Sequence, residues 1–80
     1  MEFNTKDEAI SWVNGMNNTI IDSYCVFSED AETDKKYLDM RFNGYNLPHK
    51  SKYNGISEYL ITVDKKPAIV ICVWEQVKVI

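Results

Sequence analysis

The stretch from Pro67 to Trp74 constrains the fold of this chain more than any other. It is continuously apolar, it is rich in β-branched residues, and it is far shorter than the roughly 18 residues that a membrane-spanning helix needs. A run of this kind is typical of a strand that is covered on both faces. The segment after it alternates between polar and apolar residues up to Ile80. We therefore predict a strand over residues 68–79, around which the rest of the chain is built.

The N-terminal segment carries the signals of an amphipathic helix. Thr5 and Glu8 have the spacing of a capping box, in which the Thr5 hydroxyl caps the Glu8 amide and the Glu8 carboxylate reaches back to the Thr5 amide. Behind this cap, apolar residues recur at the spacing of one helix face, and they are Ala9, Trp12, Val13 and Met16. Gly15 and the pair Asn17-Asn18 favour an end to the helix. The sequence thus predicts a helix over residues 6–16.

Three further segments, residues 19–27, 36–42 and 58–63, have the composition and spacing of strands. The two predicted faces of residues 19–27 are Ile21, Cys25 and Phe27, and Ile20, Tyr24 and Val26. The predicted inward set of residues 36–42 is Leu38, Met40 and Phe42, and the outward set is Tyr37, Asp39 and Arg41. We expect residues 19–27 and 36–42 to form a hairpin across the polar segment between them.

These elements predict a single α+β domain over residues 1–80. Its N-terminal helix packs on one face of a four-stranded antiparallel β-sheet, in the order α-β-β-β-β. Residues 43–56 are expected to form a long loop, and residues 64–67 a turn. Trp12 from the helix and Trp74 from the last strand are expected to anchor the core.

The two cysteines bear on the cellular compartment. Cys25 and Cys72 lie within predicted strands, and two cysteines are too few for a disulfide scaffold, so we expect buried, reduced thiols. A bridge between them would need the two strands to be neighbours. The N-terminus has neither the basic nor the apolar region of a secretion signal. These features predict a cytoplasmic protein.

The inventory for catalysis is sparse. His49 is the single histidine and has no Ser, Cys or Asp at a recognisable motif spacing. One histidine and two separated cysteines do not make a structural zinc site, and the three glycines do not form a phosphate-binding loop. We therefore predict no catalytic residues, no metal site, no cofactor and no enzymatic activity.

The densest charge cluster is the polar segment 28–35, with the carboxylates of Glu29, Asp30, Glu32 and Asp34. Residues 1–39 hold nine acids and three bases, a balance of −6, whereas residues 40–80 hold three acids and six bases, a balance of +3. The segment lacks the glycine and the final glutamate of an EF-hand loop. Two interpretations remain open: a solvated hairpin tip, or a partner-binding acidic loop that imitates phosphates in a basic groove.

The predicted long loop mixes aromatic and basic side chains, namely Tyr45, His49, Lys50, Lys52 and Tyr53. Aromatic rings stack on bases while lysines neutralise phosphates, so this mixture suits a small binder of single-stranded nucleic acid. The same tyrosines suit protein recognition, because they offer contact area at a low entropic cost. An ordinary loop that packs back on the sheet is the third interpretation.

Together these features predict a small, acidic, non-enzymatic interaction protein that binds and modulates or inhibits another protein. Proteins of this style are common among inhibitors and accessory factors of phages and mobile elements, which is an analogy and not a family match. Two alternatives remain: a nucleic-acid-binding module that uses the long loop, and a self-associating structural domain. In the latter, Val77, Val79 and Ile80 would lie at a sheet edge and pair with a second copy.

Overall fold

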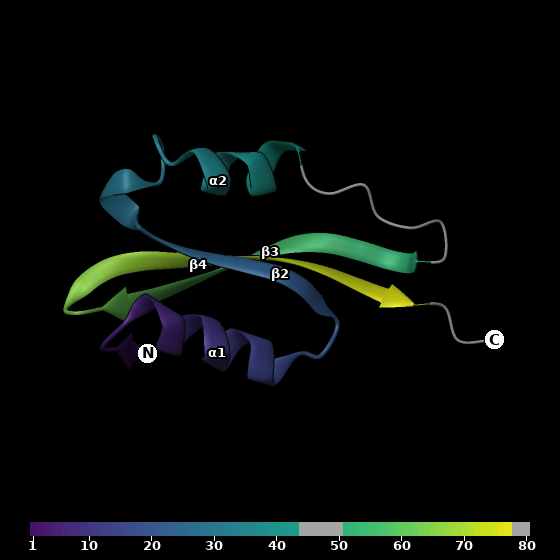
Figure 1. Cartoon of the computed structure of the whole chain (residues 1–80), viewed down its shortest axis with the longest axis horizontal. Helices are drawn as coiled ribbons and strands as arrows, with labels where there is room; N and C mark the ends of the chain where they lie inside the picture. The colour runs from purple at the N-terminus through teal and green to yellow at the C-terminus, as the bar shows by residue number, and fades with distance from the viewer. Residues whose placement is uncertain (44–50, 78–80) are drawn as a thin grey trace.

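The computed structural model describes residues 1–43 and 51–77, and the side chains of residues 1–42 and 55–76. The strands are β1 (Glu2–Phe3), β2 (Ile20–Phe27), β3 (Ser51–Val63) and β4 (Lys66–Val77). The helices are α1 (Lys6–Met16) and α2 (Lys35–Leu38), and the shorter helical turns are η1 (Ser28–Asp30, 3₁₀) and η2 (Asp39–Asn43, π-helical). These elements form three layers, with the sheet between α1 and the α2–η2 segment (Figure 1).

The four strands form one sheet in the order β1-β3-β4-β2. β4 runs antiparallel to both of its neighbours, β2 and β3, whereas β1 runs parallel to β3. The predicted α+β class, with an N-terminal helix and a four-stranded sheet, is therefore confirmed. The expectation of a wholly antiparallel sheet is wrong, because the two-residue strand β1 takes the fourth place and is parallel to its neighbour.

β4 is buried from both sides, as the apolar run predicts. Ala68, Val70 and Cys72 point toward α1 and belong to one hydrophobic cluster. Ile71 and Val73 point the other way and pack with residues of the α2 side in a second cluster. All five side chains are buried. The second cluster requires a cover of its own, so the expectation of a helix on one face only is incomplete.

Helix α1 has the predicted bounds, residues 6–16. The Thr5 hydroxyl accepts a hydrogen bond from the Glu8 amide at 3.2 Å. The Glu8 carboxylate accepts from the Asn4 amide at 3.1 Å, one residue before the expected partner. Ala9 and Val13 are fully buried against the sheet and Trp12 packs beside them, so these three members of the predicted apolar stripe face the core, whereas Met16 is 50% exposed.

The strand predicted over residues 36–42 is wrong, because this segment is helical. The Asp34 carboxylate caps α2, and the helical turns place Tyr37 and Met40 on the same side, where both are buried. A spacing of three residues joins two side chains on a helix but separates them on a strand. Phe42, expected inward, is 72% exposed. The expected hairpin is absent for the same reason, and β2 pairs with β4 instead.

The predicted strand over residues 19–27 corresponds to β2, with one change of face. Ile20 packs in the same cluster as Cys25 and Phe27, although simple alternation places it with Tyr24. An irregularity in the pairing between Ile20 and Asp22 explains the difference. An extra residue in one strand shifts every side chain before it to the opposite face.

β3 begins earlier than expected, so residues 51–56 belong to a strand and not to the predicted loop over 43–56. Residues 44–50 of that loop lie outside the described residues. At its other end, β3 turns into β4 through Asp64 and Lys65, whose φ angles are 50° and 62°. Two successive positive φ angles are characteristic of a type I′ hairpin turn. The turn is therefore tighter than the predicted turn over residues 64–67.

The two tryptophans differ in their surroundings. Trp12 packs against the first cluster and meets the Tyr59 ring edge-on at 6.1 Å between centroids, as expected of a core anchor. Trp74 lies outside both clusters, so its expected role in the core is wrong. Its ring lies against Gly55, where an added Cβ would come within 2.7 Å, and its Nε1 donates to the Ser57 hydroxyl at 3.0 Å.

The turn between β3 and β4 leads to a prediction about stability. A side chain at positive φ is strained by its Cβ, so Lys65→Gly should raise the free energy of unfolding by roughly 1 kcal/mol. Lys65→Ala is the matched control, because it removes the charge and keeps the Cβ. Urea unfolding of both variants measures the difference. An equal effect of the two substitutions would show that charge and not backbone strain is responsible.

Candidate functional site

The segment predicted as the acidic loop is ordered by its own backbone. The amides of Thr33 and Asp34 both donate to the Asp30 carbonyl, at 3.0 and 2.9 Å. Glu29, Asp30 and Glu32 are exposed, and we call these three residues the acidic shoulder. Three of the four predicted carboxylates are therefore available to a partner, at one end of the molecule.

Asp34, the fourth predicted carboxylate, serves the fold. It accepts hydrogen bonds from the Tyr37 amide at 3.0 Å and from the Tyr24 hydroxyl at 2.7 Å. The bond from the Tyr37 amide, with that from Tyr24, lowers the pKa of Asp34. The bond to Asp34, with burial, raises the pKa of Tyr24. Asp34 thus ties the start of α2 to β2.

The predicted long-loop site stays a prediction. Tyr45, His49 and Lys50 lie outside the described residues. Lys52 and Tyr53 lie on β3, but their side chains are outside the described set. The role of the five residues in nucleic-acid or protein recognition is therefore not tested by the structure.

Cys25 and Cys72 are free and buried, in agreement with the expectation from the sequence. They lie on the neighbouring strands β2 and β4 and belong to the same cluster. Burial raises the pKa of both thiols. Since the reactive form of cysteine is the thiolate, both side chains are suited to packing and not to nucleophilic chemistry. No group of three or more His, Cys, Asp or Glu side chains that could hold a metal occurs among the described residues.

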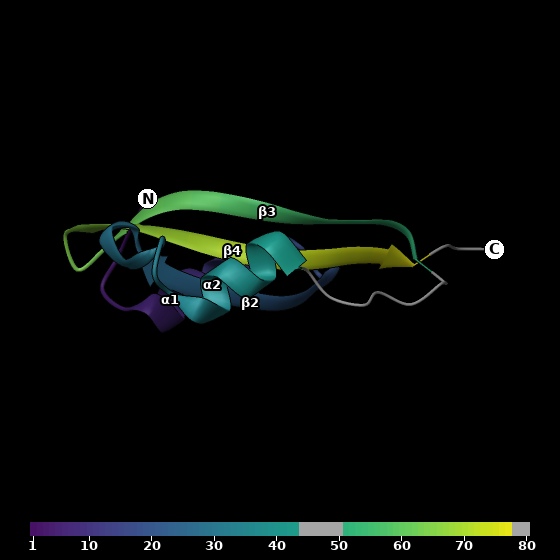
Figure 2. The same cartoon turned by 90° about the horizontal axis from the view of Figure 1, so that it is seen from above.

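The large apolar side chain with the highest exposed fraction among the described residues lies on β3. Leu60 is 80% exposed, and Ile56, on the same face of the strand, is also exposed. The neighbouring turn η2 adds the exposed Phe42. Together with Arg41 and Glu58, these residues form what we call the β3 surface (Arg41, Phe42, Ile56, Glu58 and Leu60). Figure 2 shows its origin, because α2 overlies β2 and β4 while β3 runs alongside, beyond α2.

Arg41 connects η2 to β3. Its Nε lies 3.3 Å from a carboxylate oxygen of Glu58, and its Nη1 donates to the Tyr37 hydroxyl at 3.1 Å. The guanidinium also lies over the Phe42 ring, 5.5 Å from the centroid. The Arg41 side chain is half-exposed, so the ion pair adds less than about 1 kcal/mol to stability. Its effect is positional: it holds the two halves of the β3 surface together.

A hollow of about 300 Å³ lies between the acidic shoulder and the β3 surface. We call it the α2 hollow, and its lining consists of Ala31, Glu32, Tyr37, Leu38, Arg41 and Phe42. Glu32 belongs to the acidic shoulder and Phe42 to the β3 surface. The three features therefore form one continuous region with an apolar lining and charged groups beside it.

Sequence reasoning missed the β3 surface for a definable reason. Alternation along residues 58–63 separates Leu60 from Tyr59 and Ile61, but it does not say which face is covered. The predicted strand over residues 36–42 points Phe42 inward, so the second exposed apolar residue of this surface is not recognised from the sequence either. An exposed leucine becomes visible only when the position of the helices over the sheet is known.

Comparison with known proteins gives no relative: no family model, no curated protein and no solved structure matches this chain. No helix among the described residues is both long and apolar enough to cross a membrane. The functional assignment therefore rests on the surface of the molecule itself.

The position of Asp34 leads to a second prediction. Asp34→Ala should lower the free energy of unfolding by about 1 kcal/mol, because it removes the helix cap. Glu32→Ala, a change of an exposed neighbouring carboxylate, is the matched control and should leave stability within about 0.5 kcal/mol. Chemical denaturation at neutral pH measures both. Equal stability of the two variants would contradict the structural role of Asp34.

The lowered pKa of Asp34 gives this contribution a pH dependence. The stabilisation is fully present above the pKa of an unfolded aspartate, about 4, and is lost as the pH falls through the lower pKa of the folded state. Asp34→Asn keeps a cap that does not titrate. Unfolding measured from neutral pH down to acid should therefore show a smaller loss of stability in this variant than in the wild type.

Proposed function

We propose that this protein is a small, non-enzymatic domain that binds another protein and modulates it, and that the β3 surface is its contact region. The observation that carries the proposal is the exposure of Leu60 on β3 and of Phe42 on η2, at 80% and 72%, on two elements that the Arg41–Glu58 ion pair joins. A group of large apolar side chains at the surface of a small domain marks an interaction site. Isolated exposed apolar residues would need no such explanation.

The composition of the β3 surface supports a protein partner. Arginine and aromatic residues dominate the energetic centres of protein interfaces, and here Arg41 and Phe42 are adjacent and stacked. The α2 hollow beside them is large enough for a side chain of the partner, and its apolar lining favours an aliphatic or aromatic one. The contact is thus expected to combine an inserted apolar anchor with the Arg41–Glu58 pair beside it.

The acidic shoulder supplies a second contribution. One of its three carboxylates, that of Glu32, lines the α2 hollow. Exposed charges of one sign accelerate association with a partner of opposite charge, and they add less to the affinity itself. We therefore propose a partner with a basic region beside its apolar contact. A nucleic-acid enzyme with a basic groove fits this description, and binding there would inhibit it.

Self-association through the C-terminal strand has less support. β4 lies between β2 and β3, and its residues up to Trp74 pair on both sides. β4 is therefore an interior strand as far as Trp74, while the expectation for Val77, Val79 and Ile80 stays a prediction. Val77 pairs with Ser51 of β3, while Val79 and Ile80 lie outside the described residues.

Photo-crosslinking tests the proposed function. A benzophenone amino acid in place of Phe42 should capture one protein from nuclease-treated lysate of the source cells. Leu60→Glu in the same protein should abolish that capture, because it places a charge in the apolar contact. Both sites are exposed, so folding should change by less than about 0.5 kcal/mol.

The matched control uses the opposite edge of the sheet. Ile21 is 49% exposed and lies on β2. Ile21→Glu should leave capture unchanged. Capture that survives Leu60→Glu, or that is lost equally in both variants, would show that the β3 surface is not the contact region. A product that appears only without nuclease would favour the nucleic-acid alternative.

A further inference from the structure

We infer that the partner binds as an extended strand added to the open edge of β3, along Ile56 to Leu60. This inference rests on the proposed function and specifies how the β3 surface is used. Strand addition obtains its affinity from main-chain hydrogen bonds and its selectivity from alternate side chains. The direction of the β3 backbone groups, the short length of β1 and the contrast with β2 support it.

The backbone groups of β3 alternate between its two neighbours. The amides of Thr62 and Asp64 donate to the carbonyls of Met1 and Phe3, so they point away from β4. Residues two apart on a strand direct their N–H and C=O groups to the same side. The amides and carbonyls of Ile56, Glu58 and Leu60 therefore also point to the outer edge, away from β4.

β1 occupies only one end of this edge. It pairs with β3 at Thr62 and Val63 and runs parallel to it. Among the described residues, no other strand lies on that side of β3. The pairing with β1 shows that this edge of β3 can accept a strand. The stretch from Ile56 to Leu60 has no described strand beside it on that side.

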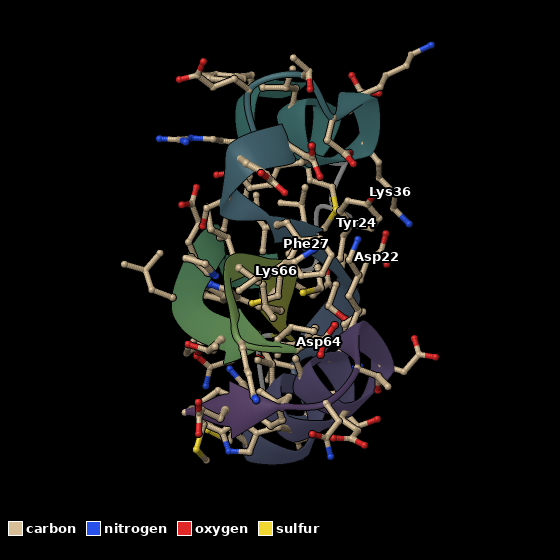
Figure 3. The ribbon with its side chains drawn as sticks, turned by 90° about the vertical axis from the view of Figure 1, so that its left-hand side faces the viewer. Asp22, Tyr24, Phe27, Lys36, Asp64 and Lys66 are labelled. Carbon is tan, nitrogen blue, oxygen red and sulfur yellow. The ribbon has the colours of Figure 1, made fainter. Side chains whose placement is uncertain are left out.

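The opposite edge of the sheet, formed by β2, has features that hinder pairing with a further strand. The pairing of β2 is irregular between Ile20 and Asp22. The Ser23 amide donates a hydrogen bond to the Asp22 carboxylate at 2.8 Å. Lys36 lies over the Tyr24 ring, which places a charge along the strand. Figure 3 shows Asp22, Tyr24 and Lys36 on the side of the sheet opposite to β3. Bulges and lysines of this kind are the usual protection of an edge against pairing.

The edge of β3 has no comparable protection among its described residues. Ile56 and Leu60 are exposed and apolar, and the charge between them, Glu58, is paired with Arg41. A strand edge with backbone groups that no strand pairs is a template for another strand. It fits a partner segment with an apolar, a polar and an apolar side chain at alternate positions. The apolar ones would pack on Ile56 and Leu60, and the polar one would face the Arg41–Glu58 pair.

A proline at Glu58 distinguishes strand addition from a contact of side chains alone. Glu58→Pro removes an outward-pointing N–H, and edge strands tolerate proline at such positions. Glu58→Ala is the matched control, because it removes the same side chain and keeps the N–H. Leu60→Pro with Leu60→Ala is a second pair, which keeps the test valid if the first proline variant does not fold. Far-ultraviolet circular dichroism checks the folding of all four.

The probe is a synthetic peptide obtained by selecting a displayed library of short linear peptides on the wild-type protein. We expect the enriched sequences to alternate apolar and polar residues. Glu58→Pro should weaken the binding of that peptide at least about tenfold relative to Glu58→Ala, because the two variants share the loss of the side chain and differ in the N–H. Fluorescence titration measures both.

Three other results would overturn the inference in different ways. Binding that survives both prolines but is lost in Leu60→Glu would replace strand addition with side-chain docking and leave the proposed function intact. Binding that survives Leu60→Glu as well would remove the proposed function too. Concentration-dependent dimers of the wild type that are lost in Glu58→Pro and kept in Glu58→Ala would make a second copy the occupant of the edge.

Discussion

The burial of β4 on both faces is the constraint on which the rest of this structure depends. A strand whose successive side chains are all apolar needs a cover above and below, and one helix provides only one. α1 covers the first face, and the segment from η1 to η2 folds over the second (Figure 1). The helical turns of α2 and η2 bring Tyr37 and Met40 into one cluster with Ile71 and Val73. Its cap by Asp34 and the bond from Tyr24 fix where it starts.

The helical segment on the α2 side does not extend over the whole width of the sheet. The short helix α2 lies over β2 and β4, so the face of β3 that carries Leu60 is left at the margin (Figure 2), whereas Trp12 of α1 reaches Tyr59 on the other face. The helical segment that completes the core on the α2 side is thus too short to cover Leu60 and Ile56, and both stay exposed. Arg41 reaches from the second cover across to Glu58, which makes the boundary between covered and open sheet a defined surface.

Local signals in the sequence predict the parts of the fold that depend on local physics. The Thr5 cap and the spacing of Ala9 and Val13 define α1, and the apolar run before Trp74 defines the central strand. Residues 36–42 cannot be predicted in this way, because their alternation is compatible with a strand. Their helical form becomes clear only from the packing of Tyr37 and Met40 on the second face of β4. The acidic shoulder is visible from composition. The β3 surface is not, because its exposure depends on where distant helices end.

Arg41 and Glu58 are brought together by folding, although they lie far apart in the sequence. The proposed contact surface is in this sense discontinuous, composed of one turn of helix and one strand. A peptide copied from β3 alone would offer the backbone edge without the Phe42 ring, the Arg41 clamp or the α2 hollow. Antibodies or selected binders raised against linear fragments should for this reason fail to cover the proposed contact surface, whereas those raised against the intact domain can reach all of it.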